Sequence, residues 1–223
     1  MITDMDRYDN HRVLVVLPHP DDESFGVSGS LAKYVKNGSQ VTYACLTLGQ
    51  MARNMGSPLF ANRITLPEIR KEELAQSCRA IGIQDLRMLG FHDKTIEFEE
   101  RELLDGAISA VIEELNPTVI YTFYPGYAVH PDHDATGAAV VRCVENLPAE
   151  RRPVVRAMAF SRGCEDIIGA PDVRVDVKDF VKQKVASVQS HKSQFWVPEL
   201  KKASQKDLED RFGTERFWTL KFD

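Results

Sequence analysis

A short, uninterrupted apolar run at residues 13–17 constrains the fold of this chain more than any other segment. Its residues, Val-Leu-Val-Val-Leu, leave no polar face, which is typical of a strand buried on both faces of a parallel sheet. Residues 28–36 then have helical character and stop at Asn37-Gly38, and residues 41–47 form a second strand-like run. Strand, helix and strand joined by short connections predict a βαβ unit, whose crossover is almost always right-handed.

The same alternation continues along the chain. Helical spacing covers residues 100–115, and residues 65–68 (Thr-Leu-Pro-Glu) predict a capping box that opens a helix to residue 81. The remaining predicted elements are strands at 86–89, 119–123 and 154–160 and helices at 134–146 and 178–194. We therefore expect residues 1–223 to form a single α/β domain with a Rossmann-like, mostly parallel sheet and helices on both faces.

The composition excludes several classes of protein. Hydrophobic residues make up 43% of the chain, as in an ordinary globular domain, and the net charge of -5 lacks the positive footprint that nucleic acid binding needs. No apolar stretch approaches the roughly 20 residues that cross a bilayer, and the acidic N-terminus is unlike a secretory signal. We expect a cytoplasmic protein without nucleic acid or membrane partners. The four dispersed cysteines form no C-x-x-C pair, and we expect them to be small buried residues.

Two histidine-containing motifs lie after predicted strands. His19-Pro-Asp-Asp-Glu23 follows the strand at 13–17, and His130-Pro-Asp-His133 follows the strand at 119–123 after a short loop. Ligands of open α/β sheets bind at the carboxyl ends of the strands, so we expect the fold to bring these motifs together. One imidazole and one carboxylate from the first motif and one imidazole from the second would supply three ligands and leave a fourth position open, as in a catalytic zinc site. Nitrogen and oxygen ligands leave iron, manganese or cobalt as alternatives.

The two motifs resemble the signature of the LmbE-like, or PIG-L-like, zinc deacetylases, which act on N-acetylglucosamine conjugates. Further matching segments, which look most like the bacillithiol biosynthesis branch of that family, lie at 43–49, 53–56, 66–70 and 123–133. The resemblance implies a zinc-dependent N-deacetylase of an N-acetylglucosamine conjugate, with N-acetylglucosaminyl malate as the expected substrate. It also implies, by family analogy, a homo-oligomer, either a trimer or a hexamer.

The same resemblance assigns roles at the matching positions. It implies that zinc is bound by His19, Asp22 and His133. It further implies that Asp21 is the general base and that His130 is the electrophile or acid. The residues agree with that division, since one of two neighbouring carboxylates can face the metal while the other faces the attacking water. Asp132 is well placed in the sequence to hydrogen-bond an imidazole and hold its charge, as carboxylates around metal sites do.

Three further residues are predicted to contact the substrate. Arg53, in the long aperiodic loop at 48–66, is expected to bind a carboxylate of the aglycone, with a solvated surface arginine as the alternative, and the loop is expected to form one wall of a pocket. Asp93 is expected to accept hydrogen bonds from sugar hydroxyls, with a turn-forming role as the alternative. Tyr127 either lines the sugar site or simply packs. Where relatives often read Gly-Glu-x-Gly, the loop reads Gly49-Gln-Met-Ala52, a departure that bears on the loop conformation and the aglycone preference.

Two residues near these segments are given no part in the chemistry. Glu23 is interpreted as a carboxylate in the first turn of a helix, where the helix dipole favours negative charge. His191 is interpreted as a histidine on a helix surface.

Other functions remain open from the residues alone. The same chemistry could act on N-acetylglucosamine itself, on a chito-oligosaccharide or on a bacillithiol S-conjugate amide. A nucleotide-binding module is disfavoured because neither G-x-G-x-x-G nor G-x-x-x-x-G-K-[ST] follows the first strand. A non-catalytic zinc-binding or regulatory protein is disfavoured by Asp21 and His130, which such a role would not require.

Overall fold

The computed structural model describes residues 8–222 and contains a seven-stranded sheet in the order β3-β2-β1-β4-β5-β7-β6. The strands are β1 (Arg12–Leu17), β2 (Gln40–Thr47), β3 (Asp85–Phe91), β4 (Val119–Phe123), β5 (Val154–Met158), β6 (Val173–Asp176) and β7 (Thr214–Leu220). Strands β1 to β5 pair in parallel, whereas β7 pairs antiparallel with both β5 and β6. The Rossmann-like, mostly parallel sheet expected from the sequence is confirmed.

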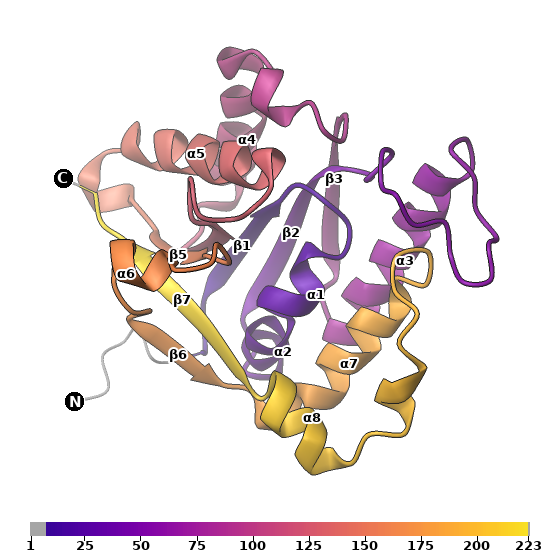
Figure 1. The fold of residues 1–223 in the computed structure, drawn as a ribbon. Coiled ribbons are helices and arrows are strands. Elements are labelled where there is room, and N and C mark those ends of the chain that lie inside the picture. The colour runs from indigo at the N-terminus through magenta and orange to yellow at the C-terminus, as the bar shows by residue number, and fades with distance from the viewer. Residues whose placement is uncertain (1–7, 223) are drawn as a thin grey trace.

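Helices cover both faces of this sheet (Figure 1). The α-helices are α1 (Asp22–Gly26), α2 (Ser28–Lys36), α3 (Leu66–Ile81), α4 (Arg101–Leu115), α5 (Pro131–Glu145), α6 (Cys164–Ile168), α7 (Val181–Ser190) and α8 (Gln205–Phe212), and short 3-10 helices are η2 (Ile96–Phe98), η3 (Ala149–Arg151), η4 (Lys178–Phe180) and η5 (Pro198–Lys201). Helices α2, α3 and α7 pack together on one face, and α4 packs on α5 on the other. Within residues 8–222, none of the helices is long and apolar enough to cross a membrane.

Successive side chains of β1 point to opposite faces of the sheet and so belong to two separate layers of the core. Val13, Val15 and Leu17 pack in the layer that includes α2 and α3, and Leu14 and Val16 pack in the layer that includes α4 and α5. All five side chains are buried. The strand is therefore apolar on both faces, which is why its sequence has no polar position.

Most predicted elements lie where the sequence placed them. The helix at 28–36 and the strand at 119–123 agree with α2 and β4 residue for residue, and all four cysteines are buried and unpaired. The predicted capping box is wrong: Thr65 makes no side-chain cap, and the Asn62 side chain instead accepts the N–H groups of Ile64 and Thr65. The predicted helix at 178–194 is too long, because that segment begins as η4 and α7 ends at Ser190.

The prediction also omits α6, α8, β6 and β7, and it gives no bounds for α1, although it places Glu23 in the first turn of a helix. Helices α1 and α6 have five residues each and β6 has four, which is too short to establish a hydrophobic period. Strand β7 reads Thr-Glu-Arg-Phe-Trp-Thr-Leu, and its Glu215 is buried although a carboxylate usually marks an exposed position. The C-terminal part of the sheet is therefore the part that the pattern fails to predict.

The order of strands reverses next to β1. The chain adds β2 and β3 on one side of β1 and then returns to its other side with β4. The loops that follow β1 and β4 thus leave neighbouring strands, in the crevice where open α/β sheets bind ligands. Both histidine motifs begin in these loops.

Helix α5 approaches the end of β4 closely at Gly137. A Cβ atom built on this glycine would lie 2.3 Å from the carbonyl oxygen of Phe123. That oxygen belongs to the backbone of a central strand, so it cannot swing aside as a flexible side chain would. The lack of a side chain at Gly137 therefore allows α5 to pack against β4 and β1.

We expect Gly137→Ala to destabilise the protein by about 1–3 kcal/mol, the usual cost of overpacking against a rigid neighbour. The matched control is Gly106→Ala in α4, where a Cβ would meet nothing within 4 Å. Alanine there should stabilise the helix by up to about 1 kcal/mol. Urea unfolding of both variants measures the two changes in the free energy of unfolding. A change of the same sign and size in both would contradict the close approach.

Candidate active site

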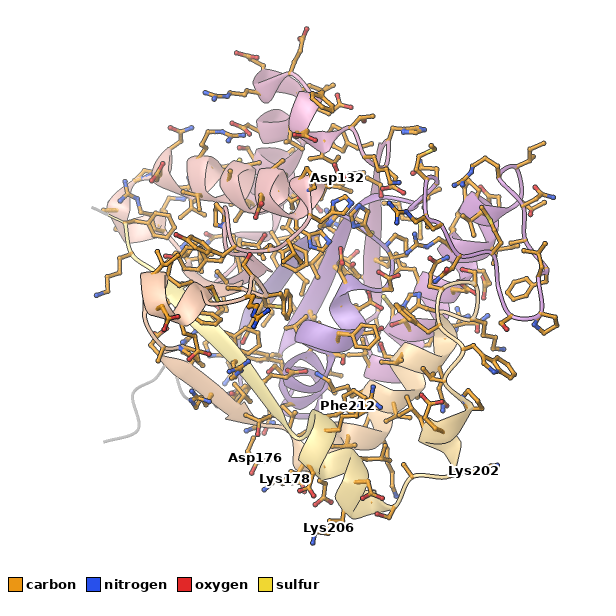
Figure 2. All side chains as sticks on the ribbon, viewed as in Figure 1. Asp132, Asp176, Lys178, Lys202, Lys206 and Phe212 are labelled. Carbon is orange, nitrogen blue, oxygen red and sulfur yellow. The ribbon has the colours of Figure 1, made fainter. Side chains whose placement is uncertain are left out.

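Two loops at the carboxyl ends of β1 and β4 carry the candidate site. His19 follows β1 and is 8% exposed. His130 is the N-cap of α5, with extended backbone, and Pro131 begins the helix at a position where its missing N–H is not needed. Asp132 and His133 follow in the first turn. Figure 2 shows Asp132 at the end of α5 that faces the middle of the molecule.

Three potential ligand side chains converge at these loops. Nδ1 of His19 lies 3.2 Å from Nε2 of His133 and 3.4 Å from Oδ2 of Asp22, and Nε2 of His133 lies 3.1 Å from Oδ1 of Asp22. Ligand atoms placed tetrahedrally at roughly 2.0–2.1 Å from zinc are about 3.3 Å apart, and each of these three contacts has about that length. Burial acts to raise the pKa of Asp22, but the neighbouring His133 and His19 outweigh it and hold that pKa well below its ordinary value. The carboxylate is therefore ionised.

Both imidazoles are held through their second nitrogen. Nε2 of His19 lies 3.0 Å from Oδ2 of the fully buried Asp132, and Nδ1 of His133 lies 3.0 Å from the carbonyl oxygen of Ala128. The His133 ring also stacks on Phe123, with 4.0 Å between ring centroids. Contacts of this kind fix which nitrogen of each ring faces a metal. The imidazole that the Asp132 carboxylate contacts is thus His19.

Two overlapping groups of potential ligands share His19. One adds His130 and His133, the other adds Asp93 and Asp132, and in each the potential ligand atoms lie within 4.8 Å of one another. In the second group it is Nε2 of His19 that faces the carboxylates, at 3.0 and 3.2 Å, and this nitrogen carries the hydrogen that they accept. The set His19, Asp22 and His133 could therefore hold a metal through Nδ1 of His19, and its nitrogen and oxygen donors are of the kind that zinc binds.

Asp21 is adjacent to this set but faces a different partner. Its backbone is left-handed, with φ 111°, a conformation that costs a non-glycine residue about 1–2 kcal/mol. The turn directs its carboxylate to Arg70, whose Nη2 lies 2.8 Å from Oδ2, while Asp22 faces His133. Burial raises the pKa of Asp21 to about 6, although the Arg70 guanidinium acts in the opposite direction. A carboxylate with that pKa is suited to accept a proton near neutral pH.

His130 lies beside the same ligand set as a neutral imidazole. Its Nδ1 accepts the N–H of Asp132 at 3.1 Å, which leaves the ring proton on Nε2. Burial and the neighbouring rings of His19 and His133 lower the pKa of His130, so the ring is uncharged at pH 7. Of the two predicted roles, electrophile and acid, this geometry favours the electrophile.

A cavity of about 360 Å³ connects these groups. Its lining includes the three ligand residues, Asp21 and His130, together with Met51, Ala52 and Arg53 of the long loop, so the expectation that the loop forms one wall is confirmed. Lys94 also lines the cavity. Arg53 and Lys94 are both exposed, and they place two cations at the opening of a cavity whose interior carries aspartates.

The long loop is tied to the end of β3. Gln50 donates from Nε2 to the carbonyl oxygen of Phe91 and accepts the N–H of Asp93 at Oε1, and the N–H of Met51 donates to Oδ2 of Asp93 at 2.7 Å. An ionised glutamate at position 50 could accept but not donate. The departure at Gly49-Gln-Met-Ala52 therefore keeps the loop attached through an amide that does both.

Asp93 lines the cavity but is only 3% exposed. Its Oδ1 lies 3.2 Å from Nε2 of His19, and its Oδ2 accepts the N–H of Met51. Both oxygens thus have a partner already, and binding of sugar hydroxyls by Asp93 stays a prediction.

Tyr127 is not brought to the cavity. Its ring packs on Tyr124 at 5.5 Å between centroids, in a small cluster that includes Trp218, and it is absent from the cavity lining. A turn between Tyr124 and Tyr127, closed by the N–H of Tyr127, directs the ring into this cluster. The ring of Tyr127 thus packs in this cluster, and a contact between Tyr127 and the substrate stays a prediction.

Arg70 is a site residue that the prediction lacks. It is 3% exposed and donates to the carbonyl oxygens of Gly49 and Pro20 as well as to Asp21. A signal was present, because Arg70 stands at helical spacing from Leu66 and Leu74 on the buried face of α3.

Glu23 and His191 are also missing from the predicted site. Both are fully buried, and Nε2 of His191 lies 2.7 Å from Oε1 of Glu23. The interpretation of His191 as a surface histidine is wrong, because its side chain is fully buried. Glu23 does lie in the first turn of α1, as interpreted, but its buried carboxylate also needs a partner such as His191. No local pattern connects two residues 168 positions apart.

The fold and the site together define a class of α/β proteins in which a cluster of histidines and aspartates lies at the carboxyl ends of two neighbouring strands. The chain belongs to the PIG-L family, described as GlcNAc-PI de-N-acetylase, which matches residues 14–144. It is 47% identical to a Bacillus cereus protein named probable N-acetyl-alpha-D-glucosaminyl L-malate deacetylase 2, over 95% of this chain and 98% of that protein.

Solved structures with this fold come from enzymes that are named for different reactions. N,N'-diacetylchitobiose deacetylase from Pyrococcus horikoshii matches with a TM-score of 0.72 at 22% identity, over 95% of this chain and 84% of that one. GalB, the 4-carboxy-2-hydroxymuconate hydratase from Pseudomonas putida, matches with a TM-score of 0.73 at 15% identity, over 95% and 97% of the two chains. At these identities the likeness establishes the fold alone, so the function must be argued from the site.

We expect Asp132→Asn to weaken zinc binding by about 10–100-fold, because Nε2 of His19 loses its charged acceptor. Titration of the metal-free protein with zinc against a competing chelator measures the affinity. Glu145→Gln, exposed at the far end of the same helix, is the control and should bind zinc as the wild type does. An unchanged affinity in Asp132→Asn would show that this carboxylate does not orient His19.

Proposed function

We propose that this chain is a zinc-dependent N-deacetylase that hydrolyses the acetamide of an N-acetylglucosamine conjugate, with N-acetylglucosaminyl malate as its substrate. The observation that carries the proposal is one cavity that holds both the convergent ligand atoms and Asp21, whose pKa is raised to about 6. The substrate is proposed from the name of the Bacillus cereus relative, which is 47% identical over 98% of its length.

His19, Asp22 and His133 are the residues that would hold the metal. When bound, zinc lowers the pKa of a coordinated water to about 7 and polarises a carbonyl group. The support for zinc is the nitrogen and oxygen donor set and its spacing, which iron(II) would share.

Asp21 is the proposed general base. Its carboxylate takes a proton from the attacking water and then delivers that proton to the nitrogen of the departing amino sugar, so that acetic acid and a free amine are the products. Arg70 holds Oδ2 of Asp21, which leaves Oδ1 for the proton transfers.

His130 is the proposed electrophile. Its neutral ring donates a hydrogen bond from Nε2 to the acetyl oxygen, on which negative charge develops as water attacks. Because Nδ1 is already occupied by the N–H of Asp132, the ring is held in the tautomer that can donate.

Arg53 and Lys94 are proposed to bind the aglycone. Malate carries two carboxylates, and each of these exposed cations at the cavity can pair with one of them. The Lys94 backbone is fixed, because its N–H donates to Oδ2 of Asp132 at 2.7 Å.

Four expectations from the sequence stay predictions: one domain over residues 1–223, a cytoplasmic location, assembly into a trimer or hexamer, and the choice among amino-sugar substrates. N-acetylglucosamine, chito-oligosaccharides and bacillithiol S-conjugates are the alternatives for the last. Comparison of kcat/KM across these compounds and N-acetylglucosaminyl malate decides the substrate.

Asp21→Asn is expected to lower kcat on N-acetylglucosaminyl malate by at least about 100-fold with zinc retained, because an amide cannot accept the proton. Amine release measured with an amine-reactive dye gives the rate, and atomic absorption gives the zinc content. Turnover equal to that of the wild type would remove Asp21 from the mechanism. A wild-type protein that releases no amine from any N-acetylglucosamine conjugate would end the proposed function.

Arg53→Ala and Lys94→Ala are each expected to raise KM for N-acetylglucosaminyl malate by about tenfold, the size of one charge-assisted hydrogen bond, with kcat little changed. Neither variant should differ from the wild type on N-acetylglucosamine, which has no carboxylate. Lys71→Ala is the control, since Lys71 is an exposed lysine of α3 outside the cavity lining. Equal increases in KM for both substrates would refute recognition of the malate.

A further inference from the structure

A fully buried polar cluster lies behind the turn that carries Asp21 and Asp22. Glu23 of α1 and His191, just after α7, are both 0% exposed. The cluster also contains three fully buried hydroxyl groups, those of Ser24, Ser77 and Ser187. A carboxylate is retained in such surroundings only when its partners offset its desolvation.

The two carboxylate oxygens of Glu23 serve different partners. Oε1 accepts hydrogen bonds from Nε2 of His191 at 2.7 Å and from the hydroxyl of Ser77. Oε2 accepts the backbone N–H of Asp21 at 3.0 Å and the hydroxyl of Tyr43 at 3.4 Å. One side of the carboxylate is therefore anchored to helices α3 and α7, and the other reaches the backbone of the proposed base.

The backbone of Asp21 needs an external contact. Asp21 precedes α1, so its N–H lies outside the hydrogen bonds of the helix, and in residues 8–222 no backbone carbonyl accepts it. Its φ of 111° is a conformation that L-residues disfavour. The Glu23 carboxylate is the acceptor that this orientation of the amide requires.

The cluster is poorly explained by packing alone. Nδ1 of His191 is buried without a hydrogen-bond partner among the described residues, which a purely structural side chain would avoid. Burial acts to lower the pKa of His191 and to raise that of Glu23, but their mutual contact outweighs burial and shifts both in the opposite direction. An apolar pair of similar volume would often give equal or greater stability at such a position.

We propose that Glu23 and His191 are a positioning pair for the general base. Glu23 holds the Asp21 backbone in its left-handed conformation, and His191 fixes Glu23 from the end of α7. The result is that Asp21 faces Arg70 and the cavity, whereas Asp22 is held separately by His19 and His133. Neither member of the pair lines the cavity, so both act through Asp21. This inference rests on the proposed function, because it takes Asp21 to be the base.

Hydrogen exchange of the Asp21 amide in the metal-free wild-type protein tests the contact without any variant. We expect NMR to show exchange at least about 100-fold slower than that of an unstructured amide, because the N–H donates to a buried carboxylate. Exchange at the unstructured rate would overturn the proposal, whatever the catalytic activity.

Glu23→Ala and His191→Ala are expected to lower kcat at least about tenfold, because the base is displaced while the groups that bind substrate and zinc stay in place. KM and zinc content should be unchanged. Glu23→Gln should restore most of the activity, since its amide oxygen can still accept the Asp21 N–H. If Glu23→Ala does not fold, His191→Ala and the amide exchange of the wild type decide the question.

Glu215→Ala is the matched control for the loss of a buried carboxylate. Glu215 is 3% exposed, pairs with Lys184 and accepts the N–H groups of Gly29 and Ser30 at 2.9 and 2.8 Å, and none of these residues lines the cavity. This variant should be less stable than the wild type. At temperatures below its unfolding transition, its kcat should equal that of the wild type. An equal loss of kcat in Glu215→Ala and Glu23→Ala would show that Glu23 supports the structure in general and does not position the base.

The possible failures are distinguishable. Wild-type kcat in folded Glu23→Ala and His191→Ala, beside an inactive Asp21→Asn, would defeat the positioning alone. A wild-type protein that is inactive on every N-acetylglucosamine conjugate would defeat the proposed function, and with it the base that the pair positions.

Discussion

The parallel pairing of β1 with β4 is the constraint on which the site depends. Val13 to Val15 pair with Val119 to Tyr121, so the two strands end at the same edge of the sheet. Backbone hydrogen bonds, rather than the polar groups of the site, thus bring His19 near His133. The many contacts of the strands offset the cost of gathering four aspartates and three imidazoles in one partly buried place. The site can therefore be rich in charge without being required to hold the fold together.

The sequence was sufficient to predict those features whose signal is local. The apolar run at 13–17 and the histidine motifs after two strands predicted the central strand and the convergence of the two motifs, because strand burial and strand-end position follow from short patterns. The contact between Glu23 and His191 could not be predicted, since neither residue carries information about a partner 168 positions away. The exclusion of Tyr127 from the cavity likewise depends on a turn whose direction has no unambiguous sequence pattern.

Two neighbouring aspartates in one short segment have pKa values that are shifted in opposite directions. Asp21 and Asp22 differ by one position, yet burial raises the pKa of the first, whereas two imidazoles hold the pKa of the second low. The difference arises from their partners, Arg70 on one side and His133 on the other. The hydratase GalB shares the fold at 15% identity, and a shared fold does not by itself determine a reaction.

The position of β7 has a consequence for synthesis of the protein on the ribosome. Within the described residues β6 pairs only with β7, and β7 lies between β6 and β5 although it is the last strand of the chain. A nascent chain that has emerged only as far as α8 therefore has an open edge at β5 and a β6 segment with no strand beside it. The same final strand carries Glu215, which binds the first amides of α2. Folding of the N-terminal half is thus completed by residues that are translated after the other six strands.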